Sequence, residues 1–141
     1  MGRTIHKLKA IFLKPRHILV VDLFGAIATT LATVFLLASE RLQTGLPTWL
    51  LYSMALVAFG FVCFDVAAIF QFLDAPVALA TIAYLNVSYC LAVLLVLCVY
   101  RMDITKPCLV YFCFEIGIVI PLAWWEWSIS RERYSSSFPV R

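Results

Sequence analysis

The chain has 141 residues, of which 64% are hydrophobic and 13% are charged, and its formal net charge is +3. A typical soluble domain carries about 25% charged residues, roughly twice this share. The composition therefore excludes an ordinary soluble globular protein and favours a single compact unit embedded in a membrane.

The first segment in chain order is basic and amphipathic. Within residues 3–14, Ile5, Leu8 and Phe12 share one face of a helix, and basic side chains crowd the remaining surface. This pattern predicts a short amphipathic helix on an anionic membrane surface, as part of a cytoplasmic tail over residues 1–17. The alternative is a basic flank that only fixes the orientation of the protein.

Four long apolar runs follow, at residues 18–38, 48–73, 77–100 and 108–127. Each run reaches the roughly 20 residues that a helix needs to cross a hydrocarbon core about 30 Å thick. Because lipid offers the backbone no hydrogen-bond partners, each run is predicted to be a transmembrane α-helix. The short connections favour antiparallel neighbours, so the sequence predicts an all-α, membrane-embedded four-helix bundle of up-down-up-down topology.

The chain ends in a polar, Ser-rich segment over residues 129–141, which is predicted to be a disordered tail and leaves residues 18–128 for the bundle. Most of the 11 Lys and Arg residues lie in the two tails. The positive-inside rule then predicts that both termini are cytoplasmic and that this multi-pass protein lies in the inner (plasma) membrane of the cell.

Three acidic residues, Asp22, Asp65 and Glu115, stand inside predicted spans, where no Lys, Arg or His is available to pair with them. An acid at the bilayer centre costs about 2.5–3.5 kcal/mol, so such a residue is usually satisfied inside the bundle and is often functional. At 1.5 Å per residue, Asp22 is expected about 6 Å from the inner boundary, Asp65 about 12 Å, and Glu115 about 18–20 Å. With Asn86 at about 13 Å, this order predicts a polar track that descends from the cytoplasmic side.

The first two acids each have a functional and a structural interpretation. Asp22 lies near the N-terminus of its helix, where the helix dipole and the nearby interface can stabilise it without any function. Asp65 has only apolar neighbours on its own helix, so its partner must come from another helix. Asp65 is then either a neutral acid that donates a hydrogen bond to Asn86 or a tyrosine, or a working proton or cation site.

Glu115 is the strongest candidate, because it lies deepest, with Tyr111 one turn before it and Gly117 and Pro121 after it. Pro121 removes the helix hydrogen bond to the Gly117 carbonyl and is predicted to kink the helix. A carboxylate beside a freed carbonyl can bind a proton, a cation or a ligand amine. The alternative is a tolerated kink with a neutral Glu115 bonded to a neighbour.

The third span carries Asn86 and Tyr89, three residues apart on one helix face. Both side chains are suited to form hydrogen bonds with acids from other helices. Interhelical hydrogen bonds of this kind average about 0.6 kcal/mol, so a structural role is the default interpretation for the pair.

The segments Asn-Val-Ser-Tyr-Cys at 86–90 and Leu-Val-Tyr-Phe-Cys-Phe-Glu-Ile at 109–116 resemble those of small bacterial four-helix integral membrane proteins. The layout is similar too, with a basic tail, an early Asp in the first span and a Pro before the second. The resemblance implies a four-helix membrane fold and brings no activity with it. It draws attention to four positions: Asn86, Tyr89, Tyr111 and Glu115.

Several chemistries lack the residues they need. His6 and His17 lie outside the spans, which leaves no ligand for a haem or a di-metal site in the bundle core. The chain also lacks the common hydrolase motifs and a glycine-rich phosphate loop. We therefore expect no catalytic residue, no cofactor, no bound metal and no nucleic-acid partner.

Two functions remain open. The first is a non-catalytic multi-pass helix-bundle component that associates with itself, as a homodimer, or with a membrane partner. The alternative is a small proton- or cation-coupled carrier or channel that uses Glu115 and Asp65 in an inward-open polar cavity. Intramembrane acids are compatible with both functions.

Overall fold

The computed structural model describes residues 15–37, 43–70 and 72–137, and the amphipathic helix predicted over 3–14 lies outside these ranges. The described residues form helices without strands, which confirms the all-α class with four long helices. The helices are α2 (Pro15–Ala32), extended by the π-helical turn η1 (Thr33–Leu37), α3 (Thr48–Ile69), α4 (Ala75–Val99) and α5 (Lys106–Ser137). All four are long and apolar enough to cross a membrane.

Proline sets the start of two helices. Pro47 has an extended backbone, with φ −60° and ψ 135°, directly before α3, and Pro76 lies in the first turn of α4. A proline is tolerated there because the first helical N–H groups have no partner inside the helix. Both starts fall within two residues of the predicted run boundaries.

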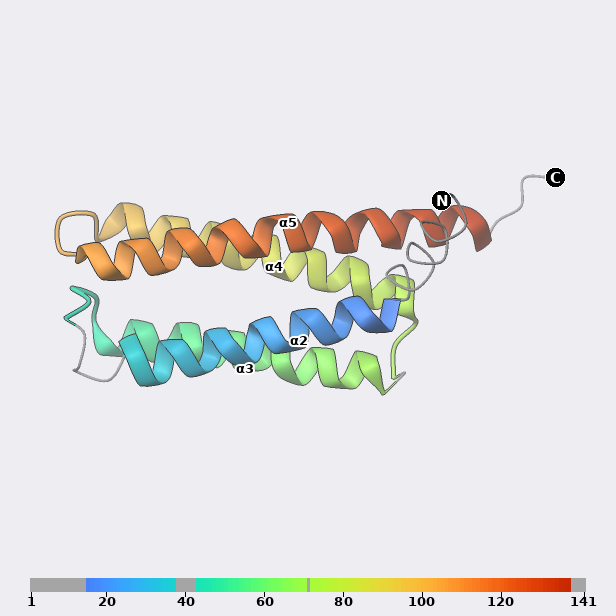
Figure 1. The fold of residues 1–141 in the computed structure, drawn as a ribbon, viewed down its shortest axis with the longest axis horizontal. Helices are drawn as coiled ribbons and strands as arrows, with labels where there is room; N and C mark the ends of the chain where they lie inside the picture. The colour runs from blue at the N-terminus through green and yellow to red at the C-terminus, as the bar shows by residue number, and fades with distance from the viewer. Residues whose placement is uncertain (1–14, 38–42, 71, 138–141) are drawn as a thin grey trace, which may run out of the picture.

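Figure 1 shows the four helices along one common axis, with consecutive helices running in opposite directions. α2 packs chiefly against α3, and α4 packs chiefly against α5, while contacts between these two pairs are sparser. The molecule therefore consists of two helix pairs that face each other. The side chains between the pairs determine the polarity and the free space of the interior.

The C-terminal part of α5 differs from the prediction of a disordered tail from residue 129, because the helix continues to Ser137. Ile129 is buried at 3% exposure, and the Ser130 hydroxyl donates a 2.8 Å hydrogen bond to the Pro76 carbonyl. These two contacts with the start of α4 add residues 129 and 130 to the bundle. Polarity alone did not indicate them.

Two connectors meet at one end of the bundle. The Thr105 amide donates a 3.1 Å hydrogen bond to the Thr44 carbonyl. Gly45 has a φ of 74°, and a Cβ atom at this position would overlap the carbonyl of Asp103. Glycine is therefore required here, both for its backbone conformation and for the close approach of the two loops.

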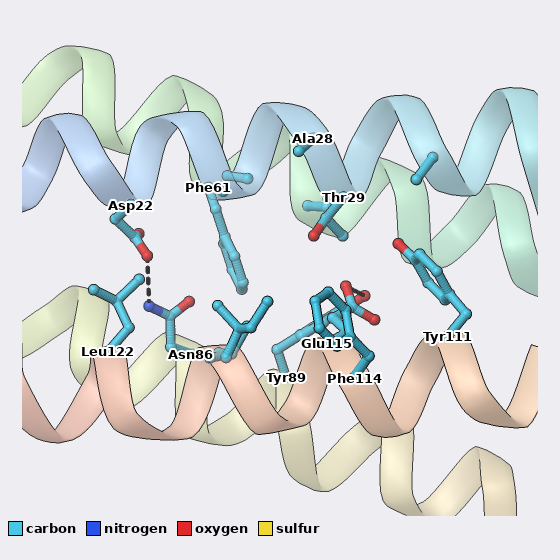
Figure 2. Close-up of a pocket in the computed structure, with 16 residues that line it drawn as sticks. Asp22, Ala28, Thr29, Phe61, Asn86, Tyr89, Tyr111, Phe114, Glu115 and Leu122 are labelled. Carbon is cyan, nitrogen blue, oxygen red and sulfur yellow. Dashed lines mark hydrogen bonds between the residues drawn. The ribbon is translucent and has the colours of Figure 1, made fainter.

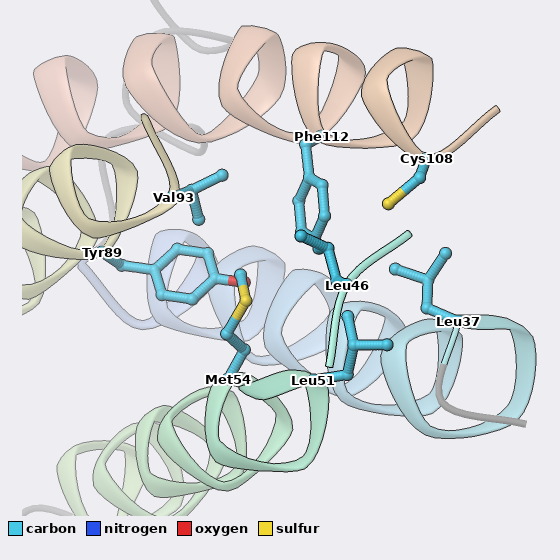
Figure 3. Packing of buried hydrophobic residues seen from close by; sticks show 8 residues of the cluster. All are labelled: Leu37, Leu46, Leu51, Met54, Tyr89, Val93, Cys108 and Phe112. Atoms are coloured by element: carbon cyan, nitrogen blue, oxygen red, sulfur yellow. The ribbon is translucent and has the colours of Figure 1, made fainter. Parts of the chain in front are cut away.

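Apolar side chains form two separate clusters in the core. The cluster that we call the loop-end plug lies beside the paired connectors (Figure 3) and comprises Leu37, Leu46, Leu51, Met54, Tyr89, Val93, Cys108 and Phe112. The cluster that we call the terminal plug lies where α2 begins and comprises Ile18, Leu19, Ala68, Ala78, Leu79, Ile82 and Ile129. The buried acids and Asn86 lie along the helices between these two plugs.

Candidate functional site

Four carboxylic acids face the interior of the bundle. Asp65 and Glu126 are 0% exposed, Asp22 is 5% exposed and Glu115 is 6% exposed. They come from α2, α3 and α5, and α4 contributes the amide of Asn86, also 5% exposed. All four helices thus supply polar side chains to the buried interior of the bundle.

The first group, which we call the acid cluster, consists of Asp22, Asp65, Asn86 and Glu126. The Asn86 amide donates one hydrogen bond of 3.0 Å to Asp22 Oδ1 and another of 3.3 Å to Glu126 Oε2. Figure 2 shows the first of these bonds bridging α2 and α4. Asp65 lies close enough to Asp22 for the two carboxyl groups to interact. A single amide thus joins acids from two helices.

The acid cluster has more acceptors than donors. Within the part of the chain that the structure describes, both oxygens of Asp65 and Oε1 of Glu126 are buried without a hydrogen-bond partner. The basic side chains of the described helices, such as Arg16 and Arg131, lie at or near helix ends rather than in this layer. Unpaired buried oxygens are costly, so the acid cluster lacks the hydrogen-bond donors that ionised carboxylates need in a protein interior.

Glu115 forms a second group with Tyr89 and Thr29. The Tyr89 hydroxyl donates to Glu115 Oε1 over 3.2 Å, a long distance for such a bond, and Oε2 is buried without a partner. Thr29 of α2 faces the same carboxyl across the gap between α2 and α5 (Figure 2). Glu115 therefore keeps one oxygen free to accept a further donor.

A cavity of about 220 Å³ extends between the two groups. Polar residues of both groups line it, namely Asp22, Asn86, Tyr89, Glu115 and Thr29, together with Tyr111. The α2 wall consists largely of small residues, and a Cβ atom added at Gly25 would meet nothing within 4 Å. The small side chains of α2 thus leave room that α5 does not fill.

The described walls of the cavity open between α2 and α5, whereas we predicted an opening toward the cytoplasmic end. The exposed residues among its walls lie on these two helices and include Gly25, Ala28, Phe114 and Ile118. At the predicted cytoplasmic end, the described residues of the terminal plug close the interior. Among the described residues, apolar side chains pack where α2 begins, and the inward opening of the cavity stays a prediction.

The predicted helix kink is not part of this site. Gly117 and Pro121 are exposed, and neither lines the cavity next to Glu115. α5 is assigned as one helix across Pro121. Gly117 follows Glu115 by two residues, so the two positions lie on nearly opposite helix faces, and the freed carbonyl does not join the Glu115 group.

The structure replaces the graded polar track with two groups at different levels. Asp22 and Asn86 are in direct contact, although their estimated depths differ by about a factor of two. The depth of a residue counted from the edge of its own apolar run does not include the axial offset between neighbouring helices. The sequence-based selection also omits Glu126, which follows Glu115 by about three turns and shares its face. That spacing is the signal that would have found it.

Comparison of the chain with models of known protein families, with curated proteins and with solved structures found no match. Among the described residues, no group of three or more His, Cys, Asp or Glu side chains is arranged to hold a metal ion. The acid cluster, Glu115 and the cavity are the features of the described residues that bear on function.

Proposed function

We propose that this chain is an integral membrane protein that acts as a small proton- or cation-coupled carrier. Its four helices cross the bilayer in up-down-up-down order, with both termini cytoplasmic in the plasma membrane. The length and apolar character of the helices support the membrane assignment. So do the large apolar side chains exposed around the bundle, such as Phe24, Leu56 and Leu95. The proposal contains no catalytic step.

The observation that carries the proposal is the burial of four carboxyls beside a cavity that Asp22 and Glu115 line. Among the described residues, Asp65, Glu115 and Glu126 each have at least one carboxyl oxygen without a hydrogen-bond partner. A carboxyl that holds either a proton or a cation, but not both, exchanges one for the other. Such an exchange couples the movement of the two species across a membrane. Intramembrane acids that face a cavity are commonly part of ion or proton pathways.

The second candidate is the non-catalytic bundle component that associates with itself or with a membrane partner. In this function the acids are either hydrogen-bonded within the bundle or paired with a partner's basic residue. Their burial among the protein's own helices argues against the paired form, and the unpartnered oxygens argue against the bonded form. We therefore rank this candidate second.

The test is ion movement in proteoliposomes that contain the full chain and an internal pH-sensitive dye. We expect an imposed cation gradient to drive proton movement, and we expect Glu115→Gln and Asp65→Asn to abolish it. Asp74→Asn is the matched control, because this acid is exposed in the connection before α4. Proton movement that survives both interior substitutions refutes the carrier function.

A further inference from the structure

We propose that the cavity between α2 and α5 binds an organic ammonium ion with a small aromatic body, and that Glu115 is its anionic partner. The inference rests on the proposed function and names the class of cation that the carrier takes. Three features of the cavity carry it, and they concern its charge, its walls and its opening.

Two carboxyls line the cavity, and Glu115 is the one with an unpartnered oxygen, because Asp22 accepts a hydrogen bond from Asn86. Glu115 is 6% exposed, its Oε2 has no hydrogen-bond partner, and its side chain points into the cavity (Figure 2). Tyr89 already donates to the other oxygen and so holds the carboxyl in place. An ammonium N–H donor that reaches Oε2 forms a charge-assisted hydrogen bond, which is stronger than a neutral one.

The walls around this carboxyl are aromatic. Four rings, from α3, α4 and α5, line the cavity: Phe61, Tyr89, Tyr111 and Phe114. Phe61 and Tyr89 meet edge to face, with ring centroids 5.9 Å apart at 78°. Aromatic faces attract a cation and also accommodate an apolar body. A carboxylate surrounded by rings is therefore suited to an ammonium group that carries an apolar substituent.

Divalent metal ions fit this cavity poorly. Ca²⁺ takes about six to eight oxygen ligands, and Mg²⁺ retains several of its waters. Apart from its few polar side chains, the cavity is walled by apolar residues such as Ala58, Ile118, Val119 and Leu122. These side chains cannot replace the water around a metal ion, but they can contact an organic body.

The size and the opening agree with such a ligand. An apolar protein cavity of about 150 Å³ is known to hold benzene, and this cavity is about 220 Å³. One ring with a methylammonium group therefore fits. The exposed rim between α2 and α5 lets an amphipathic cation enter sideways, from the apolar phase that surrounds the helices.

The experiment measures binding of benzylammonium to the purified full chain in detergent by isothermal titration calorimetry. We expect saturable binding that Glu115→Gln weakens by about tenfold or more, the factor that losing a charge-assisted bond implies. Benzyl alcohol has nearly the same shape as benzylammonium but no charge. Its affinity for the native chain should be no higher than the affinity of benzylammonium for the Glu115→Gln variant. Equal binding of the alcohol and the ammonium to the native chain overturns the inference.

A second pair of variants tests the cavity without touching Glu115. Gly25→Leu places a side chain in the cavity at a position where an added Cβ meets nothing, so it should block benzylammonium while the protein still folds. Gly60→Leu is the control, because Gly60 is equally open and lies outside the cavity. Binding that Gly25→Leu leaves intact overturns the inference.

The same two assays separate this inference from the proposed function. If proteoliposomes exchange protons for cations but benzylammonium does not bind, the carrier stands and the ligand class is wrong. If benzylammonium binds at Glu115 and no cation gradient drives proton movement, the site stands and the carrier function is wrong.

Discussion

Asn86 is the donor that holds the acid cluster together, because its amide bonds to both Asp22 and Glu126. Replacing it with Leu, which has a similar volume, leaves two buried carboxyls without this donor. We expect Asn86→Leu to lower the free energy of unfolding by about 1–3 kcal/mol. Chemical unfolding in detergent, with Val87→Leu on the exposed face as the control, measures the effect. An Asn86→Leu protein as stable as the control would contradict the assigned role.

Asp65 is buried, and neither of its carboxyl oxygens has a hydrogen-bond partner among the described residues, so its acid group is a cost to folding rather than a contribution. Asp65→Asn keeps the shape and supplies N–H donors toward Asp22. We expect the variant to be more stable than the native chain by about 0.5–2 kcal/mol, the usual gain when a functional residue is neutralised. Thermal unfolding compared with Asp74→Asn tests this, and a clear loss of stability would show that the acid is structural.

Glycine has a different role in the connectors than in the helices. Gly45 combines a positive φ with the close approach of the Asp103 carbonyl, whereas Gly60 is helical with open space around it. We expect Gly45→Ala to lower the free energy of unfolding by more than about 1 kcal/mol, because a methyl group forces the two connectors apart. Gly60→Ala should be neutral or raise it by about 0.5–1 kcal/mol through helix propensity. Unfolding curves in which the two variants behave alike would refute this assignment.

The existence and type of the four helices could be predicted from the sequence, because apolar runs of this length are a local signal. The ends of the helices were harder to predict from the sequence. Ile129 and Ser130 belong to the bundle through contacts with α4, although their surroundings in the sequence are polar. Such contacts depend on a neighbouring helix, and the sequence pattern around residues 129 and 130 does not identify that helix.

The orientation of the whole molecule in the membrane is a prediction from its charge distribution. In a variant without its native cysteines, a single cysteine at Met102, which is 85% exposed, should react with an impermeant maleimide added outside intact cells. A single cysteine at Ser136 should react only after the membrane is permeabilised, because the positive-inside rule assigns both termini to the cytoplasm. The opposite labelling pattern would invert the assigned topology.

For the molecule as a whole, the sequence alone determined the number of long apolar helices and most of the acids that are buried among them. Both follow from the local cost of polar groups in lipid. Only the tertiary structure decided which acids meet, that Glu126 joins them, and that the cavity opens between α2 and α5. The physical reason is that the axial offset and rotation of packed helices depend on side chains far apart in the chain. No count of residues along one helix contains that information.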